Sequence, residues 1–235
     1  VRSVFKSAAL DRLIGSSPAA RITLPRHETP RIVPLTAAQV QALAEAMPER
    51  YRALVVAQAG LGLRISELLG LQPEDIGWLE LVVRVRHQLQ RDGQLGPPKT
   101  PRSIRDVPLP RFVADEVSAH LARWPAGKTL WTAEQGQPVR HDWYGAHVFK
   151  RAVRDAGLPA STSPHDLRHA FASWLLAAGE SVVAVAERLG HENATLVLTT
   201  YGHLVPGSED RTRRALDAAW SASDPGVTRL GVERL

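Results

Sequence analysis

The sequence contains no cysteine and only one methionine, Met47, among its 235 residues. Without cysteine the protein cannot form disulfides, use a thiolate nucleophile or build a cysteine-ligated zinc site, and this composition fits a reducing interior. Long apolar runs are missing too, because the longest nearly apolar stretch, residues 170–178, is far too short to span a bilayer. The first residues also lack the successive charged, apolar and small-residue segments of a signal peptide. We therefore expect a cytoplasmic protein without a membrane partner.

Positive charge is in excess, with a net charge of +5, and it is clustered in two parts of the chain. Residues 1–35 carry six Arg or Lys against two acidic residues, and residues 81–111 carry seven against two. Clustered positive charge suits a polyanion such as DNA, because each neutralised phosphate releases counterions. An arginine-rich solvated surface has the same composition, so charge alone leaves both interpretations open.

The chain divides at one proline-rich segment. Residues 16–34 hold four prolines and are predicted to form an extended linker. Residues 1–15 have the apolar spacing of a single helix with nothing of its own to pack against. The sequence starts with Val and not Met, which favours a fragment of a longer protein. We expect one main domain over residues 35–222 and a flexible tail over residues 223–235.

Hydrophobic periodicity predicts an α+β fold that is mainly α, with a small antiparallel β-sheet. A helix is expected to start at Thr36, because T-A-A-Q has the pattern of a capping box. Further helices are predicted over residues 49–61, 65–69, 110–123, 140–156, 164–178, 181–189, 193–200 and 207–221. Strands are predicted over residues 81–89, 102–109 and, more briefly, 129–132.

Two segments carry cations that need a partner. G-L-R-I-S-E-L, residues 62–68, places Arg64 in an apolar helix with Glu67 three residues later. Glu67 could orient the guanidinium for a phosphate, or the two could form a plain helix ion pair. Lys99 in P-P-K-T-P-R lies between two predicted strands. A hairpin tip there could place its ammonium group in a groove or in solvent.

The segment S-P-H-D-L-R-H, residues 163–169, has the pattern of a helix N-terminus capped by Ser163. His165 and Arg168 then share one face close to the positive end of the helix, which favours an anion. His165 and His169 also have the i, i+4 spacing of two metal ligands. Because a third ligand and the glutamate of the H-E-x-x-H motif are missing, we expect no metal here.

The segment L-G-H-E-N-A-T-L-V-L-T-T-Y-G-H, residues 189–203, contains His191 and, ten residues later, Tyr201. A glycine next to each of them predicts the end of a helix. Tyr201 is one of three tyrosines in the chain and is poorly placed for a simple core residue. A core or surface role is the alternative that this segment leaves open by itself.

Together these residue types are those that phosphoryl transfer to a tyrosine needs. Tyrosine, with a pKa near 10, is a weak nucleophile unless cations stabilise its oxyanion. The phosphorane formed from a diester carries negative charge that arginine forks and histidine donors can match. The departing deoxyribose hydroxyl needs a proton, which a lysine could supply. With cationic side chains in these roles, we expect no metal or other cofactor.

These motifs, with A-S-W-L-L-A-A-G after H-D-L-R-H, have the order and spacing of the tyrosine recombinase (phage integrase) family. The chain resembles the catalytic part of that family over about residues 1–205. The resemblance implies that Arg64 and Arg168 bind the phosphate. It also implies that Lys99 is the general acid.

The resemblance further implies that His165 and His191 lie beside the phosphate, that Glu67 is a structural acidic residue of the site, and that Tyr201 is the nucleophile. The implied activity is that of a site-specific recombinase or integrase, which needs neither metal nor ATP. A 3′-phosphotyrosyl bond forms, a free 5′-hydroxyl attacks it, and strands exchange through a four-way junction.

The implied partner is double-stranded DNA, bound by a homotetramer. From the second basic cluster we expect four arginines to contact DNA: Arg84, Arg86, Arg102 and Arg105. The segment from Arg211 to Trp220 is predicted to form a helix with one apolar stripe. In related recombinases such tails pack on a neighbouring protomer, so we expect this tail to dock in trans on DNA.

The chain departs from the family pattern at two points. Leu61 stands where many members have Thr, and residues 1–15 correspond to only the last helix of the family's N-terminal core-binding domain. A type IB topoisomerase would share the chemistry, but such enzymes do not usually carry the L-G-H…T-Y-G-H-L ending. A non-catalytic DNA-binding module or an all-helical scaffold would not need the complete set of charged residues.

Overall fold

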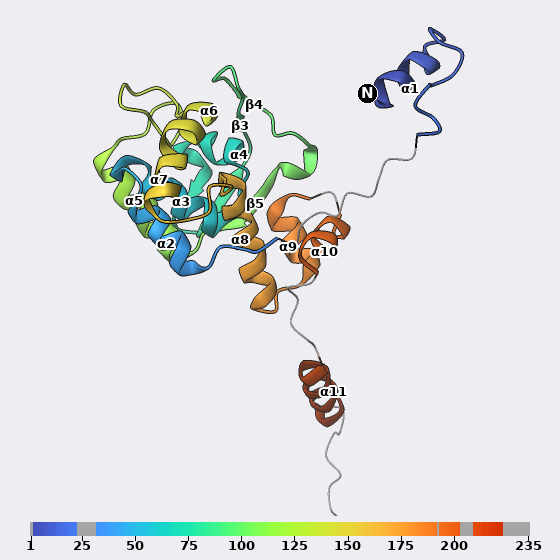
Figure 1. Ribbon diagram of the computed structural model, residues 1–235. Coiled ribbons are helices and arrows are strands. Elements are labelled where there is room, and N and C mark those ends of the chain that lie inside the picture. The colour runs from blue at the N-terminus through green and yellow to red at the C-terminus, as the bar shows by residue number, and fades with distance from the viewer. Residues whose placement is uncertain (1, 23–31, 192, 203–208, 223–235) are drawn as a thin grey trace, which may run out of the picture. The chain divides into compact units, whose positions relative to one another are not determined.

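The computed structural model describes residues 2–22, 32–191, 193–202 and 209–222 (Figure 1). Contacts group residues 1–31 and residues 32–235 into two separate compact units. The first unit contains α1 (Arg2–Leu10), none of whose residues is buried. The second unit contains all the other elements. None of the helices in the described part is long and apolar enough to cross a membrane.

Helix α3 (Glu49–Leu61) is the centre of the second unit, because nine of its 13 residues are buried. It packs against three other helices, namely α2 (Ala37–Glu45), α5 (Arg111–Arg123) and α8 (Pro164–Ala177) (Figure 1). The predicted start of α2 is confirmed, because the Thr36 and Gln39 side chains each accept a hydrogen bond from the other residue's backbone N–H. The same core includes the buried residues of the sheet.

A three-stranded antiparallel sheet has the order β1-β2-β5. Its strands are β1 (Ile76–Gly77), preceded by η1 (Pro73–Asp75), then β2 (Val82–Val85) and β5 (Arg105–Pro108). Val83 pairs with Val107, and both side chains are fully buried. A separate hairpin pairs β3 (Gln88–Leu89) with β4 (Leu95–Gly96). The predicted fold class, mainly helical with a small antiparallel sheet, is confirmed.

The strands are shorter than predicted. Residues 81–89 form two strands, because β2 pairs with β5 whereas β3 pairs with β4. The proline-led 3₁₀ turn η2 (Pro101–Ser103) delays the start of β5 to Arg105. The strand predicted over residues 129–132 is wrong, because only Thr132 makes a bridge there, with Pro138.

The helix predicted over residues 140–156 is continuous but changes its winding. It runs through α6 (His141–Trp143), the π-helical η3 (Tyr144–Phe149) and α7 (Lys150–Asp155). A π-turn inserts a wider loop of backbone into an α-helix. Here it coincides with the fully buried Tyr144.

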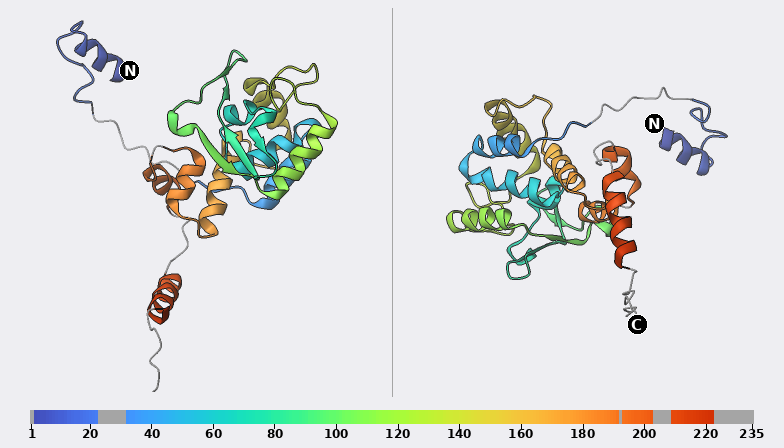
Figure 2. Two further views of the ribbon diagram at one scale, coloured as in Figure 1. Left: turned by 180° about the vertical axis from the view of Figure 1, so that it is seen from behind. Right: turned by 90° about the horizontal axis from the view of Figure 1, so that it is seen from below.

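Helix α9 (Val182–Leu189) connects the elements that carry most of the predicted site residues. It packs against α8, against β5 and against α10 (Thr195–Tyr201), and Figure 2 shows α8, α9 and α10 gathered in the orange part of the chain. A second apolar cluster joins these three helices. The short α4 (Ile65–Leu69) follows α3, and α11 (Glu209–Ala222) is the last helix described.

Candidate active site

The C-terminal end of α9 holds three arginine side chains. The carbonyl oxygens of residues 188, 189 and 190 accept hydrogen bonds from Arg105, Arg168 and Arg64, in that order, at 2.7, 2.7 and 3.3 Å. The last carbonyl groups of a helix have no partners within it and carry a partial negative charge. They therefore stabilise three guanidinium groups that would otherwise repel one another.

Two glycines shape this junction. Gly190 ends α9 at φ 66°, and a Cβ there would lie 3.0 Å from an Nη atom of Arg105. Gly62 ends α3 at φ 62°, and a Cβ there would lie 2.2 Å from the ring of Phe171. The carbonyl of Gly62 accepts a second hydrogen bond from Arg168, at 2.8 Å. Only glycine fits both the left-handed backbone and the space.

Glu67 is buried beneath two of the arginines, with 1% of its surface exposed. Its Oε1 lies 2.6 Å from Nη1 of Arg64, and its Oε2 lies 3.0 Å from Nη2 of Arg105. Burial by itself would raise the pKa of this carboxyl, but Arg105 and Arg64 outweigh it and hold the pKa below its usual value. The predicted contact between Arg64 and Glu67 is confirmed, and Arg105 extends it to a triad.

Arg168 is the most enclosed of the three arginines, with 2% of its surface exposed. Burial and the positive charge of Arg64 lower its pKa to about 9. The guanidinium therefore stays charged at neutral pH. Its hydrogen bonds to two backbone carbonyls compensate for its removal from water.

His165 and His191 lie within the field of these arginines. Burial, followed by Arg168 and Arg64, lowers the pKa of His191 to about 4, and burial and Arg168 also lower the pKa of His165. Nδ1 of His191 is shielded from solvent and has no hydrogen-bond partner within the described part of the chain. A buried polar nitrogen beside clustered guanidinium groups is suited to contact an anion.

Tyr201 is the last residue of α10 and is 2% exposed. Its hydroxyl makes a short hydrogen bond with Nδ1 of His169. Burial raises the pKa of Tyr201 to about 12, although the positive charge of Arg168 opposes this. The phenol is therefore protonated at neutral pH, and it lies within the electrostatic influence of the arginine that is expected to bind the phosphate.

The phage integrase family matches this sequence over residues 34–207. The chain belongs to that family. It is 35% identical over 208 residues to the tyrosine recombinase XerC of Rhodospirillum centenum, and the matched region covers 81% of this chain and 56% of that protein. It is 30% identical over 239 residues to the tyrosine recombinase XerD of Corynebacterium glutamicum, covering 95% of this chain and 72% of that protein. The chain thus spans little more than half the length of some of its curated relatives.

Solved structures of integrases and recombinases share the fold. The Tn1549 transposon integrase, solved in complex with a circular intermediate DNA, superposes with a TM-score of 0.76 at 27% identity, covering 93% of this chain and 76% of that one. The XerA recombinase superposes with a TM-score of 0.61 at 19% identity, covering 94% and 75%. The chain therefore has the fold of the catalytic domain of tyrosine recombinases.

Of the six residues that the family resemblance places in catalysis, Lys99 lies apart. It is exposed, and it follows β4 in the loop leading to η2, so it does not occupy the hairpin tip at residues 90–94. Within the described residues its side chain makes no hydrogen bond or ion pair with the other five. The loop is nevertheless tied to the arginines, because Ser103 accepts a hydrogen bond from Arg64 at 3.0 Å and its hydroxyl lies 3.1 Å from that of Thr100.

The four arginines expected to contact DNA have different environments. Arg105 differs from the expectation, because its side chain is 7% exposed and its guanidinium bonds to Glu67 and to backbone carbonyls. Nη2 of Arg86 lies 2.5 Å from Oδ1 of Asp106, and Nη2 of Arg84 lies 3.9 Å from Oε2 of Glu80. Both ion pairs are near the surface. Arg102 is exposed. DNA contact by Arg84, Arg86 and Arg102 stays a prediction.

The spacing of the sequence relates His169 to His165 only as a pair of possible metal ligands. The two rings lie 4.5 Å apart and nearly perpendicular, but no group of three or more potential metal ligands occurs among the described residues. Its contact with Tyr201 joins residues 32 positions apart, which motif spacing does not encode. The sequence signal that points to a role for His169 in the site is its position directly after Arg168.

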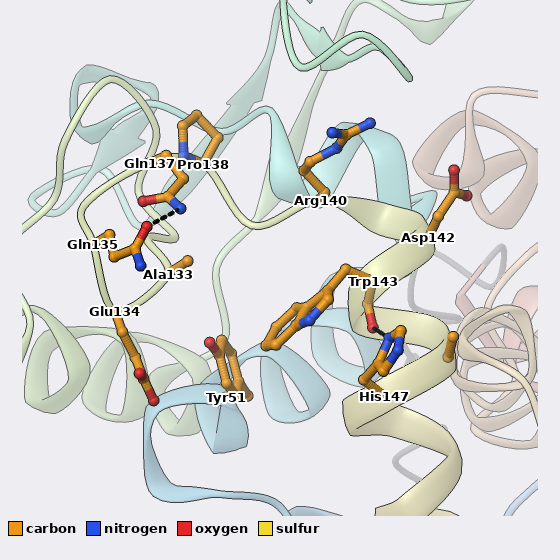
Figure 3. Close-up of a pocket in the computed structure, with 11 residues that line it drawn as sticks. Tyr51, Ala133, Glu134, Gln135, Gln137, Pro138, Arg140, Asp142, Trp143 and His147 are labelled. Carbon is orange, nitrogen blue, oxygen red and sulfur yellow. Dashed lines mark hydrogen bonds between the residues drawn. The ribbon is translucent and has the colours of Figure 1, made fainter.

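A cavity lies away from these residues. Its volume is about 730 Å³, and Figure 3 shows Tyr51, Glu134, Trp143 and His147 among the residues that line it. The ring of Tyr51 meets that of Trp143 edge-on at 5.8 Å. None of the predicted catalytic residues lines this cavity, so the candidate site is defined by its cations and not by an apolar pocket.

Proposed function

We propose that this chain is the catalytic domain of a site-specific DNA recombinase that cleaves and rejoins strands through Tyr201. The observation that supports it best is the set of three guanidinium groups held at the end of α9. One of them, that of Arg168, acts electrostatically on the hydroxyl of Tyr201. Such a preorganised cationic site stabilises a phosphorane without having to rearrange during the reaction. A DNA-bound relative with the same fold is consistent with this role.

In the proposed reaction the phenolic oxygen of Tyr201 attacks a backbone phosphorus, the phenolic proton passes to water, and the bond from phosphorus to the 5′-oxygen breaks. Arg64, Arg168 and His191 contact the non-bridging oxygens. Lys99 gives a proton to the departing 5′-oxygen, leaving a 3′-phosphotyrosyl bond and a free 5′-hydroxyl. Attack by a 5′-hydroxyl on another strand reverses these steps and completes the exchange.

This mechanism requires Lys99 to approach the phosphate. Its position in the loop before η2 supports that role, because the Thr100–Ser103–Arg64 hydrogen bonds hold the far end of the loop at the site. An exposed ammonium close to such an anchor can turn toward a bound phosphate without a change in the core.

The decisive test is a covalent protein–DNA band on a denaturing gel. We expect Tyr201→Phe to bind DNA but to form no adduct, since only the nucleophilic oxygen is lost. Tyr144→Phe is a matched control, because Tyr144 is fully buried and its hydroxyl has no partner within the described residues. An adduct that persists in Tyr201→Phe would contradict the proposal. Relaxation of supercoiled DNA that lacks a recombination site would instead favour a type IB topoisomerase.

The proposal includes assembly of a homotetramer on double-stranded DNA, with α11 docking on a neighbouring protomer. On α11, Leu216 and Trp220 stand at i and i+4, and both are largely exposed. An apolar groove of about 760 Å³ between α2, α3, α5 and α8 is suited to receive them. Phe112 and Trp174 line it together with the acidic Asp115 and Glu116, and the first half of α11 carries three arginines against two acidic residues.

Assembly on DNA tests this docking. We expect Leu216→Asp on the helix, and Phe112→Asp in the groove, each to weaken formation of the four-protomer complex, as measured by native gel or light scattering. A mixture of the two variants should recover part of the assembly, because an intact helix can then meet an intact groove on another protomer. No recovery, or normal assembly by both single variants, would exclude docking in trans at this groove.

A further inference from the structure

The hydroxyl of Tyr201 has a partner that the motif-based assignment does not include. Nδ1 of His169 shares a hydrogen bond with it. The two rings lie 5.5 Å apart between centroids, tilted at 59°. Because Tyr201 is 2% exposed, this hydrogen bond provides a polar partner for a hydroxyl that water hardly reaches.

Helix α8 supplies both this partner and the most enclosed arginine. Arg168 and His169 are consecutive, so their side chains leave the helix about 100° apart. Arg168 bonds to carbonyls at the ends of α3 and α9, whereas His169 faces the end of α10. One rigid helix therefore fixes where the proposed phosphate ligand and the proposed nucleophile stand relative to each other.

The groups around His169 keep its imidazole neutral. His165 lies against it, Arg168 precedes it, and Asp166 is the acidic neighbour on the same helix. Burial, then His165 and Arg168, lower the pKa of His169 to about 4, against the opposing effect of Asp166. A neutral imidazole that carries its proton on Nε2 accepts a hydrogen bond at Nδ1.

Helix α10 gives Tyr201 little support of its own. It has seven residues, too few for a stable isolated helix, and Tyr201 is its last. The second apolar cluster packs the ring of Tyr201, but it offers no polar group to fix the hydroxyl. Displacement of a reacting atom by about 1 Å can cost roughly 100-fold in rate.

We propose that His169 is a positioning residue for Tyr201, accepting the hydrogen bond of its hydroxyl at Nδ1 and holding the phenolic oxygen beside Arg168. This inference rests on the proposed function of Tyr201 as nucleophile. Positioning requires a hydrogen-bond acceptor at the place of Nδ1, but not a group that takes up the proton. A positioning acceptor and a proton-accepting base therefore differ in which substitutions of His169 they tolerate.

Three variants of the full chain separate them. His169→Asn keeps an acceptor near the place of Nδ1, His169→Gln moves it toward that of Nε2, and His169→Leu removes it. We expect His169→Leu to form the DNA adduct at least about 100-fold more slowly, at unchanged DNA binding. His169→Asn should stay within about tenfold of the parent, with His169→Gln between them. His141→Asn, at an exposed histidine, is the control.

Equal impairment of His169→Asn and His169→Leu would overturn the positioning role, because an acceptor without basicity would then be useless. Full activity of His169→Leu would overturn it as well. If His169→Leu proves unstable on heating, the comparison of His169→Asn with His169→Gln decides alone. Equal rates for that pair would contradict the inference.

A measurement without DNA keeps this inference separate from the proposed function. The chain has three tyrosines, so fluorotyrosine labelling gives three ¹⁹F resonances, and Tyr201→Phe identifies the one from position 201. We expect that resonance to shift in His169→Leu and to stay near its place in His169→Asn. An unmoved resonance in His169→Leu would refute the contact itself, whether or not Tyr201 attacks DNA.

Discussion

The cations of the candidate site fall into two groups with opposite surroundings. Arg64, Arg105 and Arg168 are fixed by helix-end carbonyls and by Glu67, whereas Lys99 projects from a loop without a side-chain partner in the described residues. The groups that would stabilise charge are in place before any DNA arrives. The group that would deliver a proton is not. In the proposed reaction, charge stabilisation would therefore be preorganised, whereas proton delivery by Lys99 would depend on the bound substrate.

The largest effect on the rate of DNA cleavage should follow from removing one of the fixed arginines. We expect Arg168→Ala and Arg64→Ala each to slow DNA cleavage by roughly 10² to 10³-fold, the scale for losing one donor to a developing oxyanion. Arg168→Ala should also lower stability, because it leaves two buried carbonyls without their donor. Single-turnover cleavage and thermal unfolding measure the two effects. Arg151→Ala, at an arginine that is 75% exposed, is the control, and cleavage near the parental rate would return Arg64 or Arg168 to a structural role.

The proposed role of Lys99 as general acid can be tested by changing the leaving group of the substrate. Lys99→Ala should cleave ordinary DNA about 100-fold more slowly, since the departing alkoxide needs a proton. Replacing the bridging 5′-oxygen by sulfur gives a leaving group that ionises near pH 8.5 and needs none. On that substrate Lys99→Ala should nearly match the parent, whereas Arg64→Ala should gain much less. If Lys99→Ala is impaired equally on both substrates, it is a phosphate contact and the acid lies elsewhere.

Local sequence signals predicted most of the fold but not the environment of every side chain. The caps at Thr36 and Ser163 and the helix ends at Gly62 and Gly190 follow from residues within a few positions, and the structure confirms them. Arg105 is expected from the sequence to contact DNA, whereas the structure places its guanidinium against Glu67, and a sequence signal for this inward position was present. Arg105 is two residues from the buried Val107 on the same strand, so both point to the core face.

The anchoring of Arg64 could not have been predicted in this way. Its bond to the carbonyl of Gly190 spans 126 positions. No periodicity or motif specifies such a contact, because it depends on how α9 packs against β5 and α8. The same holds for His169 and Tyr201, whose contact depends on how α8 and α10 meet.

A smaller effect is expected at the glycine that ends α9. Gly190→Ala must place a Cβ at φ 66° and 3.0 Å from Arg105, so we expect a stability loss of about 1–2 kcal/mol and several-fold slower cleavage. Gly136→Ala is the matched control, because Gly136 also has a positive φ but open space around it. It should lose similar stability and cleave like the parent. Slower cleavage by both variants would show that strain anywhere in the fold, and not the junction, limits the reaction.

The smallest effect concerns pH. The pKa values of His169 and His191 are lowered to about 4 in the folded protein, below the ordinary value of 6.5. The unfolded chain therefore binds more protons between these values, and the free energy of unfolding should fall as pH drops from about 6.5 toward 4. We expect the Tm of the DNA-free protein to decrease by a few degrees between pH 7 and pH 5, on the scale of roughly 2–4 °C per kcal/mol. His191→Asn should flatten this dependence, and an unchanged slope in that variant would contradict the assignment.

The attachment of three arginines to successive carbonyls of α9 makes their arrangement collective. A tilt or retreat of that one helix would withdraw one hydrogen bond from each of Arg64, Arg105 and Arg168 at the same time, so it would perturb all three guanidinium groups together. Substitutions on the outer face of α9, such as at the exposed Val183, can then alter the readiness of the whole site without touching a reacting group. If the proposed DNA cleavage is the activity of this chain, a change in the position of one helix would then alter the reactivity of the whole cationic site.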